Sequence, residues 1–204
     1  MSRTNETLIQ ALKESGALKT AAVEDALRAV DRADFVPEEL RADAYLDTAL
    51  PIGYGQTISQ PTVVAFCLEQ LAVAHGMRVL DVGSGSGYTT ALLSQLVGPA
   101  GEVVGVETIP ELVAFGQENL AKYAPTNARI EAAGAALGKP SAAPFDRILV
   151  SAAAEEMPAA LKEQIADGGR IVLPVQQSIC VVDRQGDFFP FQCHEGYVFV
   201  PLVT

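Results

Sequence analysis

The sequence has few positive charges, and this shortage restricts the partners that the protein can have. Its 204 residues include 14 lysines and arginines against 25 aspartates and glutamates, which gives a formal net charge of −11. Such a chain lacks the cationic surface that neutralises phosphates and dominates affinity for nucleic acids. We therefore expect no nucleic-acid partner.

Histidine, cysteine and long apolar runs are scarce as well. The two histidines, His75 and His194, have no metal-ligand spacing, so we expect surface residues and no metal site. No run of 18 apolar residues occurs, and the first residues lack the apolar run of a signal peptide, so we expect no membrane segment. The three cysteines form no C-x-x-C pair and predict reduced, buried thiols in a cytoplasmic protein, although Cys180 and Cys193 could face each other across a hairpin.

The stretch from Arg78 to Tyr88 is the most informative part of the sequence. The apolar run from Val79 to Val82 predicts a buried parallel strand, and the apolar spacing from Tyr88 to Val97 predicts a helix. Glycine lets the backbone approach a ligand closely, and the start of a helix offers free N–H groups. A ligand site is therefore expected at the three glycines between strand and helix, which are Gly83, Gly85 and Gly87.

Two acidic residues indicate which ligand this site takes. The spacing G-x-G-x-G fits neither the dinucleotide pattern G-x-G-x-x-G nor the phosphate loop G-x-x-x-x-G-K. Asp81 ends the first strand, where it can pair with an amino group, and Glu107 ends the next strand, Val103 to Val106, where it can accept hydrogen bonds from both hydroxyls of a ribose. A ribose and an ammonium without a phosphate describe S-adenosylmethionine. A tight turn with solvated acids is the alternative.

A second segment, Ala49 to Pro61, is rich in glycine and hydroxyl residues. Pro61 fits the first turn of a helix, so Ser59 and Gln60 lie at a helix N-terminus. That position suits a carboxylate, because N–H donors and the positive end of the helix dipole meet there. The alternative is that Ser59 only caps the helix.

These motifs resemble those of the protein-L-isoaspartate O-methyltransferase family, from about Asp31 to the C-terminus. The glycine loop is shared by many methyltransferases, whereas the segment Gly-Gln-Thr-Ile-Ser-Gln-Pro at residues 55–61 is specific to that family. Further matching segments lie at residues 31–32, 35–37, 44–47, 50–53, 105–107, 145–146, 152–154, 168–175 and 198–202.

The resemblance implies a monomeric, S-adenosyl-L-methionine-dependent carboxyl O-methyltransferase that methylates L-isoaspartyl residues in damaged proteins or peptides as a repair step. It implies Ser59 as the catalytic residue, holding the substrate carboxylate. The expected cofactor-binding residues are Thr57, Ile58, Asp81, Gly83, Ser84, Gly85, Gly87, Glu107, Thr108, Gly134 and Ala135. The expected substrate-binding residues are Gln56, Thr57, Ile58, Ser59, Gln60 and Val200.

The chain departs from the family pattern at two positions. Gly134 stands where the pattern Gly-Asp-Gly has the aspartate that, in the family, accepts the adenine amino group. Thr62 stands where the family often has histidine or tyrosine. Two alternatives therefore remain: a methyltransferase of the same fold that acts on another carboxylate, and a cofactor-binding protein without turnover.

The expected fold is α/β, with a doubly wound, mostly parallel seven-stranded sheet and a C-terminal antiparallel hairpin. We expect a helical and loop-rich cap with the substrate-binding segment over residues 1–75, where no strong strand pattern appears, and a Rossmann-like cofactor domain over residues 76–204, which together form one compact unit. Thr4 and Thr20 are expected to cap the first two helices. Later expected elements are strands at 128–132, 145–150 and 171–173, a helix from Pro158 through Ile165, a hairpin of 179–182 with 188–192, and a closing antiparallel strand from Tyr197 to Leu202.

Overall fold

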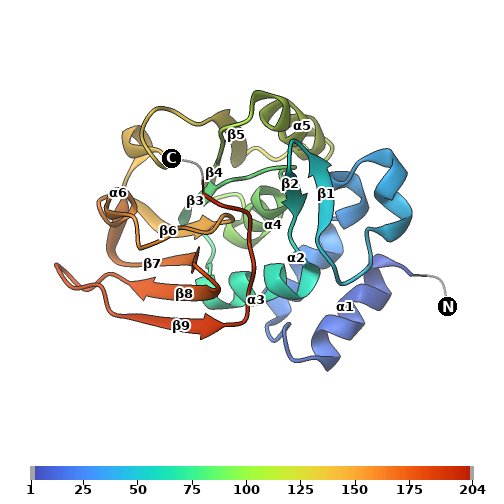
Figure 1. Cartoon of the computed structure of the whole chain (residues 1–204), viewed down its shortest axis with the longest axis horizontal. Helices are drawn as coiled ribbons and strands as arrows, with labels where there is room; N and C mark the ends of the chain where they lie inside the picture. Colours follow the sequence, from blue (N-terminus) through green and yellow to red (C-terminus); the bar gives the residue numbers. More distant parts are fainter. Residues whose placement is uncertain (1–2, 203–204) are drawn as a thin grey trace.

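A seven-stranded sheet forms the centre of the computed structural model, which describes residues 3–202. The spatial order is β5-β4-β3-β6-β7-β8-β9, and Figure 1 shows β8 and β9 at one end of the molecule, far from α1. The five strands from β5 to β7 in this order run parallel, and β8 and β9 are antiparallel additions, which confirms the expected fold class. The bounds are β3 Arg78–Val82, β4 Glu102–Glu107, β5 Ala128–Ala132, β6 Phe145–Val150, β7 Ile165–Val175, β8 Ser178–Asp183 and β9 Phe191–Glu195.

Apolar packing on both faces explains why β3 and β4 carry nearly continuous apolar sequences. Successive side chains of a strand point to opposite faces, so Val79 packs in one apolar cluster and Leu80 in the other. The cluster around Val79 also contains Leu8 and Leu27, so the N-terminal helices share one core with the sheet. The helices are α1 Asn5–Glu14, α2 Ala21–Ala29, α3 Pro61–Leu71, α4 Tyr88–Val97, α5 Pro110–Ala121 and α6 Ala159–Lys162, with short 3-10 turns at Arg32–Phe35, Glu38–Asp43 and Pro140–Ala142.

Helix starts in the N-terminal region follow the predicted capping residues. The Thr4 hydroxyl accepts a hydrogen bond from Thr7 N at 3.2 Å, and the Thr20 hydroxyl accepts one from Val23 N at 3.4 Å. Pro61 is the first residue of α3, as its fixed φ predicts. Local side-chain chemistry therefore determines where these three helices begin.

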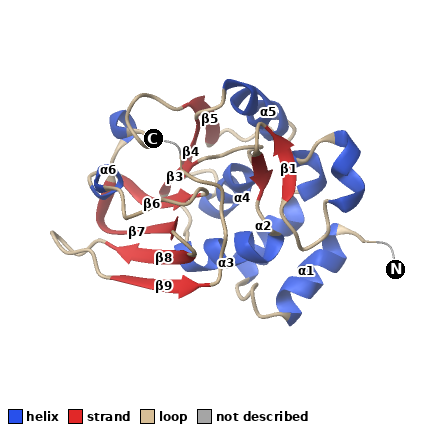
Figure 2. Cartoon of the chain, viewed as in Figure 1, coloured by secondary structure: helices blue, strands red, loops and turns tan. Residues whose placement is uncertain are grey.

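The expectation of no strands before residue 75 is wrong. Two short strands, β1 Leu50–Gly53 and β2 Gln56–Ile58, form an antiparallel hairpin that stands among the N-terminal helices in Figure 2, apart from the main sheet. Its turn needs a positive φ at both Tyr54 and Gly55. Strands of four and three residues, one of them containing Pro51, are too short to show a period of two, so the sequence pattern missed them.

Two predicted boundaries and one predicted strand near the C-terminus are also wrong. Helix α6 ends at Lys162, and Ile165 begins β7 because its fully buried side chain packs in the core beside β6. The second strand of the hairpin, β9, starts three residues later than predicted. The segment from Tyr197 to Leu202 is not a closing antiparallel strand: it crosses to the end of β6, where Ala153 N donates to Val200 O and Leu202 N donates to Ala153 O, both at 2.8 Å.

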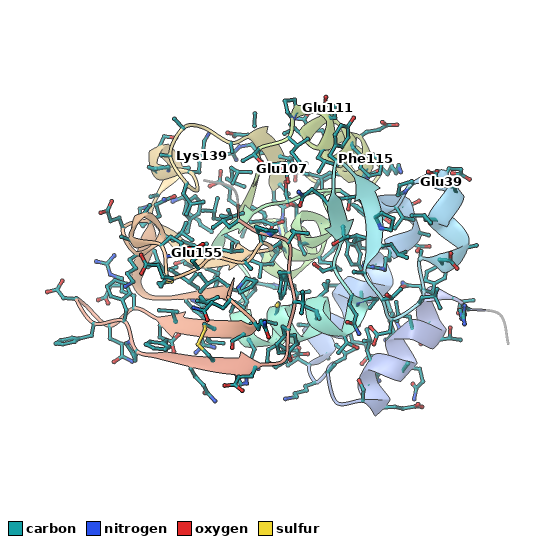
Figure 3. All side chains as sticks on the ribbon, viewed as in Figure 1. Glu39, Glu107, Glu111, Phe115, Lys139 and Glu155 are labelled. Carbon is teal, nitrogen blue, oxygen red and sulfur yellow. A yellow bond between two sulfur atoms is a disulfide. The ribbon has the colours of Figure 1, made fainter. Side chains whose placement is uncertain are left out.

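The prediction of three reduced thiols is wrong for two of the cysteines. The register of β8 and β9 places Cys180 directly opposite Cys193, with 4.0 Å between their Cα atoms, and the two form a disulfide that is visible in Figure 3. Only Cys67 among the described residues is free; it is buried, as expected, and burial raises the pKa of its thiol to about 12. Because the cytoplasmic location was inferred from three reduced thiols, the disulfide removes that reason for it. His194 is half-buried, with its ring edge-on to Phe66 at 5.1 Å, whereas His75 is exposed as expected.

None of the helices within residues 3–202 has the length and apolar character that crossing a bilayer requires.

Counting thiols tests the disulfide. Denatured protein without reductant should release one thiol, that of Cys67, and reduced protein should release three. Because the cross-link closes a short loop, Cys193→Ser should lower the free energy of unfolding by about 3 kcal/mol, measured by urea denaturation. Reduced wild type should match the variant, and three thiols before reduction would contradict the pairing.

Candidate active site

A cavity of about 390 Å³ opens at the C-terminal ends of β3, β4 and β6. Here the order of the sheet changes direction, with β4 and β5 on one side of β3 and β6 and β7 on the other, and ligands of α/β sheets bind at such a switch point. Hairpin β1–β2 and the loops after β5 and β6 complete the wall. The predicted site residues that line the cavity are Gln56, Thr57, Ile58, Ser59, Gly83, Ser84, Gly85, Glu107, Thr108, Gly134, Ala135 and Val200. Asp81, Gly87 and Gln60 do not line it.

The glycine loop between β3 and α4 is bound to the end of β4. The N–H groups of Gly83 and Ser84 donate to the carbonyl oxygen of Val106 at 2.9 and 3.1 Å. Gly87 has φ 88°, and a Cβ there would lie 2.9 Å from the carbonyl oxygen of Gly116 in α5. A larger residue at position 87 would therefore be strained and would push α5 away from the loop.

Glu107 connects this loop to the next strand and faces the cavity. The residue is 6% exposed, and its carboxylate is well bonded: Oε2 accepts from Gly85 N at 3.0 Å, and Oε1 accepts from Thr108 N at 2.7 Å and Ile109 N at 3.0 Å. Figure 3 labels Glu107 near the centre of the molecule, among the strand ends. Within the described chain Oε2 accepts only this one hydrogen bond from Gly85 and can accept another from a ligand hydroxyl, so the geometry suits the predicted ribose contact.

Asp81 lies behind the cavity wall rather than in it. Its side chain is fully buried, and Oδ2 accepts from the hydroxyls of Thr89 and Thr90, both at 2.7 Å. Oδ1 has no partner among the described residues, and burial raises the pKa of the carboxyl to about 6. Thr89 lines the cavity and thus connects it to Asp81, so direct pairing of Asp81 with a ligand cation stays a prediction.

The polar groups of the wall suit a ligand without phosphate. Glu107 is the one charged residue among the described residues that line the cavity. Next to it, Ser84 is 4% exposed, and its buried hydroxyl has no partner in the described chain. The Glu107 carboxylate and the Ser84 hydroxyl are groups that a ribose and an ammonium can satisfy, whereas Asp81 Oδ1, unpartnered among residues 3–202, lies behind the wall.

The loop after β5 leaves open space at Gly134. A Cβ built at this glycine would meet no atom within 4 Å, and its φ is not positive. Ala133 N donates to the carbonyl oxygen of Glu107 at 2.7 Å, which ties this loop to the same strand end. A larger side chain could therefore be accommodated at Gly134, which lines the cavity.

A second cavity, of about 430 Å³, adjoins the first. Gln60 lines it, whereas four residues line both cavities and mark their junction: Thr57, Ser59, Ser151 and Val200. Ser151 directly follows an apolar strand, so the sequence places it at the ligand edge of the parallel sheet, although no role was predicted for it.

Ser59 does not cap α3, so that alternative is wrong. The N-cap residue is Gln60, and its side chain makes no capping bond. Instead, Asp47 binds the start of the helix, with Oδ1 accepting from Thr62 N at 2.8 Å and Oδ2 from the Thr62 hydroxyl at 2.6 Å. One N–H of this helix start, that of Thr62, is therefore already bonded and does not serve a carboxylate ligand. Ser59 remains half-buried at the junction without a hydrogen bond to another described side chain or backbone group.

Comparison with known proteins gives consistent matches along the chain. The family model for protein-L-isoaspartate(D-aspartate) O-methyltransferase matches residues 3–204. A protein-L-isoaspartate O-methyltransferase of Methanopyrus kandleri is 42% identical over 98% of this chain and 92% of its own, and one of Anaeromyxobacter dehalogenans is 52% identical over 80% and 79%. The crystal structure of a Plasmodium falciparum protein-L-isoaspartate O-methyltransferase in complex with S-adenosyl-L-homocysteine is 27% identical, with a TM-score of 0.89 over 98% of both chains.

Burial of Asp81 predicts a pH effect on stability. Because its pKa in the folded protein, about 6, lies above the ordinary value of 3.8, the folded state holds its proton more tightly, and stability is lost as the pH rises through about 6. Asp81→Asn has no such group. The free energy of unfolding of the variant minus that of wild type should therefore increase between pH 4 and pH 7.5, by up to about 3 kcal/mol. Urea denaturation without ligand measures it. The same difference at both pH values would contradict the argument.

Proposed function

The chain belongs to the protein-L-isoaspartate(D-aspartate) O-methyltransferase family, and we propose that it transfers the methyl group of S-adenosyl-L-methionine to the free α-carboxylate of L-isoaspartyl residues in proteins or peptides. The observation that carries this proposal is the junction of the two cavities at Ser59. One cavity has the acceptors for the cofactor, and the other lies along the family-specific segment at residues 55–61.

S-adenosyl-L-methionine is the cofactor, and the first cavity has a size and chemistry that fit it. Its volume of about 390 Å³ lies in the range of small-molecule sites. We assign Glu107 Oε2 to the ribose hydroxyls, and the Ser84 hydroxyl with the Thr89–Asp81 pair to the ammonium. The apolar loop from Ala133 to Leu137 remains for the adenine ring. When bound, the cofactor supplies a methyl group activated by its positive sulfonium.

The reaction needs no general base. A substrate carboxylate with an ordinary pKa of about 3.9 is ionised at pH 7, so no proton has to leave before it attacks. In agreement, the residues that line the two cavities include no histidine or lysine in the described chain. The protein acts by positioning, which contributes about 7–11 kcal/mol when reactants are well oriented. The Ser59 hydroxyl holds one carboxylate oxygen and leaves the other free to attack.

The product is a methyl ester, and this is what makes the reaction a repair step. An ester carbonyl is a better electrophile than a carboxylate, so the neighbouring peptide nitrogen can close a succinimide and release methanol. Opening of that ring with water gives normal aspartate in part. A protein or peptide is therefore the proposed partner. Both cavities are lined by one chain, so a monomer is sufficient, and the net charge of −11 disfavours nucleic acid.

One assay separates the proposed function from the two alternatives. Thr62, which suggested a different carboxylate substrate, bonds to Asp47 and lines neither cavity, so its change leaves the site walls as they are. Methyl transfer from labelled S-adenosyl-L-methionine should occur to an isoaspartyl peptide and not to its aspartyl twin. Transfer to neither peptide, with cofactor binding intact, would contradict the isoaspartyl substrate and leave both alternatives standing.

Substitution of Ser59 tests its catalytic role. Ser59→Ala should lower kcat/KM for the isoaspartyl peptide at least tenfold, which is about 1.4 kcal/mol of transition-state stabilisation. Because Ser59 makes no capping bond, the melting temperature should hardly change, and cofactor affinity should stay the same. Ser178→Ala, a half-buried serine that lines neither cavity, is the matched control. Wild-type kcat/KM in Ser59→Ala would remove Ser59 from the mechanism.

A second substitution tests the adenine side of the cavity. Gly134→Asp should tighten cofactor binding by about 1 kcal/mol, because it adds a hydrogen-bond acceptor where the structure has open space. Gly134→Ala, which adds a Cβ without an acceptor, should leave the affinity unchanged in titration calorimetry. Equal or weaker binding in Gly134→Asp would mean that the adenine ring lies elsewhere.

A further inference from the structure

Ser151 shares with Ser59 the junction of the two cavities, and it has no assigned role. Of the four residues that line both cavities, three carry a hydroxyl: Thr57, Ser59 and Ser151. A side chain at this junction borders both the cofactor and the substrate. Thr57 is exposed, whereas Ser59 and Ser151 are half-buried, so the two serines are better shielded from competing water.

The backbone of Ser151 is fixed relative to the glycine loop. It directly follows β6, and its N–H donates to the carbonyl oxygen of Val82, the last residue of β3, at 2.9 Å. Its Cβ lies 3.9 Å from where a Cβ on Gly83 would stand. Ser59 reaches the junction from the segment before α3, in a different part of the fold. The two serines therefore approach the junction from two independent walls.

The Ser151 hydroxyl is free to bind a ligand. It makes no hydrogen bond to any residue of the described chain, although the backbone that carries it is tied to β3. A half-buried hydroxyl has one proton to donate, and a ligand acceptor at the junction is a natural partner. The carboxylate that attacks at this place has an oxygen that must be held while the other reacts.

We propose that Ser151 is a further catalytic residue, whose hydroxyl donates a hydrogen bond to the non-attacking oxygen of the substrate carboxylate, alongside Ser59. This rests on the proposed function. Two donors on one oxygen prevent rotation of the carboxylate and leave the other oxygen directed at the methyl group. The hydroxyl keeps its proton throughout, so no base or other reactant is required.

Single variants separate this role from a structural one. Ser151→Ala should lower kcat/KM for the isoaspartyl peptide at least tenfold, whereas Ser151→Thr, which keeps the hydroxyl, should recover most of that loss. The affinity for S-adenosyl-L-homocysteine, measured by calorimetry, should stay within twofold, and the melting temperature should match that of the Ser178→Ala control. Weaker cofactor binding in Ser151→Ala, or the same loss in Ser151→Thr, would overturn the proposal.

A double variant tests whether both serines hold the same group. If they do, Ser59→Ala and Ser151→Ala together should lower kcat/KM by less than the product of the single effects, because the second donor is worth less once the carboxylate rotates. If the two losses of kcat/KM multiply instead, the serines do not hold the same carboxylate oxygen. No transfer to the peptide by wild type would refute the proposed function and this inference with it, whereas wild-type transfer that Ser151→Ala leaves unchanged would refute only the role of Ser151.

Discussion

The hydrogen bonds of the Glu107 carboxylate are the interaction on which the site depends. One oxygen holds the N–H of Gly85 and the other holds the N–H groups of Thr108 and Ile109, so a single side chain fixes the loop after β3 to the start of the segment after β4. The loop after β5 joins the same point through Ala133 N and the Glu107 carbonyl oxygen. Three neighbouring strand ends thus form one rigid wall. Because the carboxylate is nearly buried, these bonds also offset the desolvation of its charge.

Close contacts between glycines make this wall possible. A Cβ on Gly116 in α5 would lie 2.8 Å from the carbonyl oxygen of Gly85, and one on Gly105 in β4 would lie 2.8 Å from the Thr90 hydroxyl. Neither glycine lies in the recognised loop, yet both let the helix and the strand approach it. The turn at Gly87 depends on the same approach, since its own Cβ would meet α5. The G-x-G-x-G motif is therefore half of an arrangement whose other half is in β4 and α5.

The charge distribution explains how an acidic protein can act on a carboxylate. No lysine or arginine occurs in residues 42–77 or 185–204, the stretches that supply most of the second cavity. Arg32 is fully buried, with its guanidinium 5.4 Å from the Tyr88 ring centre, and lines neither cavity. Neutral hydroxyls such as those of Ser59 and Ser151 are thus the polar donors at the junction. A neutral donor orients a carboxylate without neutralising it, which preserves its reactivity toward a cation.

The sequence by itself determined the strand, glycine turn and helix from Arg78 to Val97, the starts of three helices at Thr4, Thr20 and Pro61, and the family segment that contains Ser59. Each of these depends on a local cause, such as a buried apolar run, a capping hydroxyl or the fixed φ of proline. Tertiary structure decided the rest: the β1–β2 hairpin, the pairing of Cys180 with Cys193, the position of Asp81 behind the wall and that of Ser151 at the junction. These depend on the register between strands and on which loops meet at the switch point, and neither is encoded in the spacing of neighbouring residues.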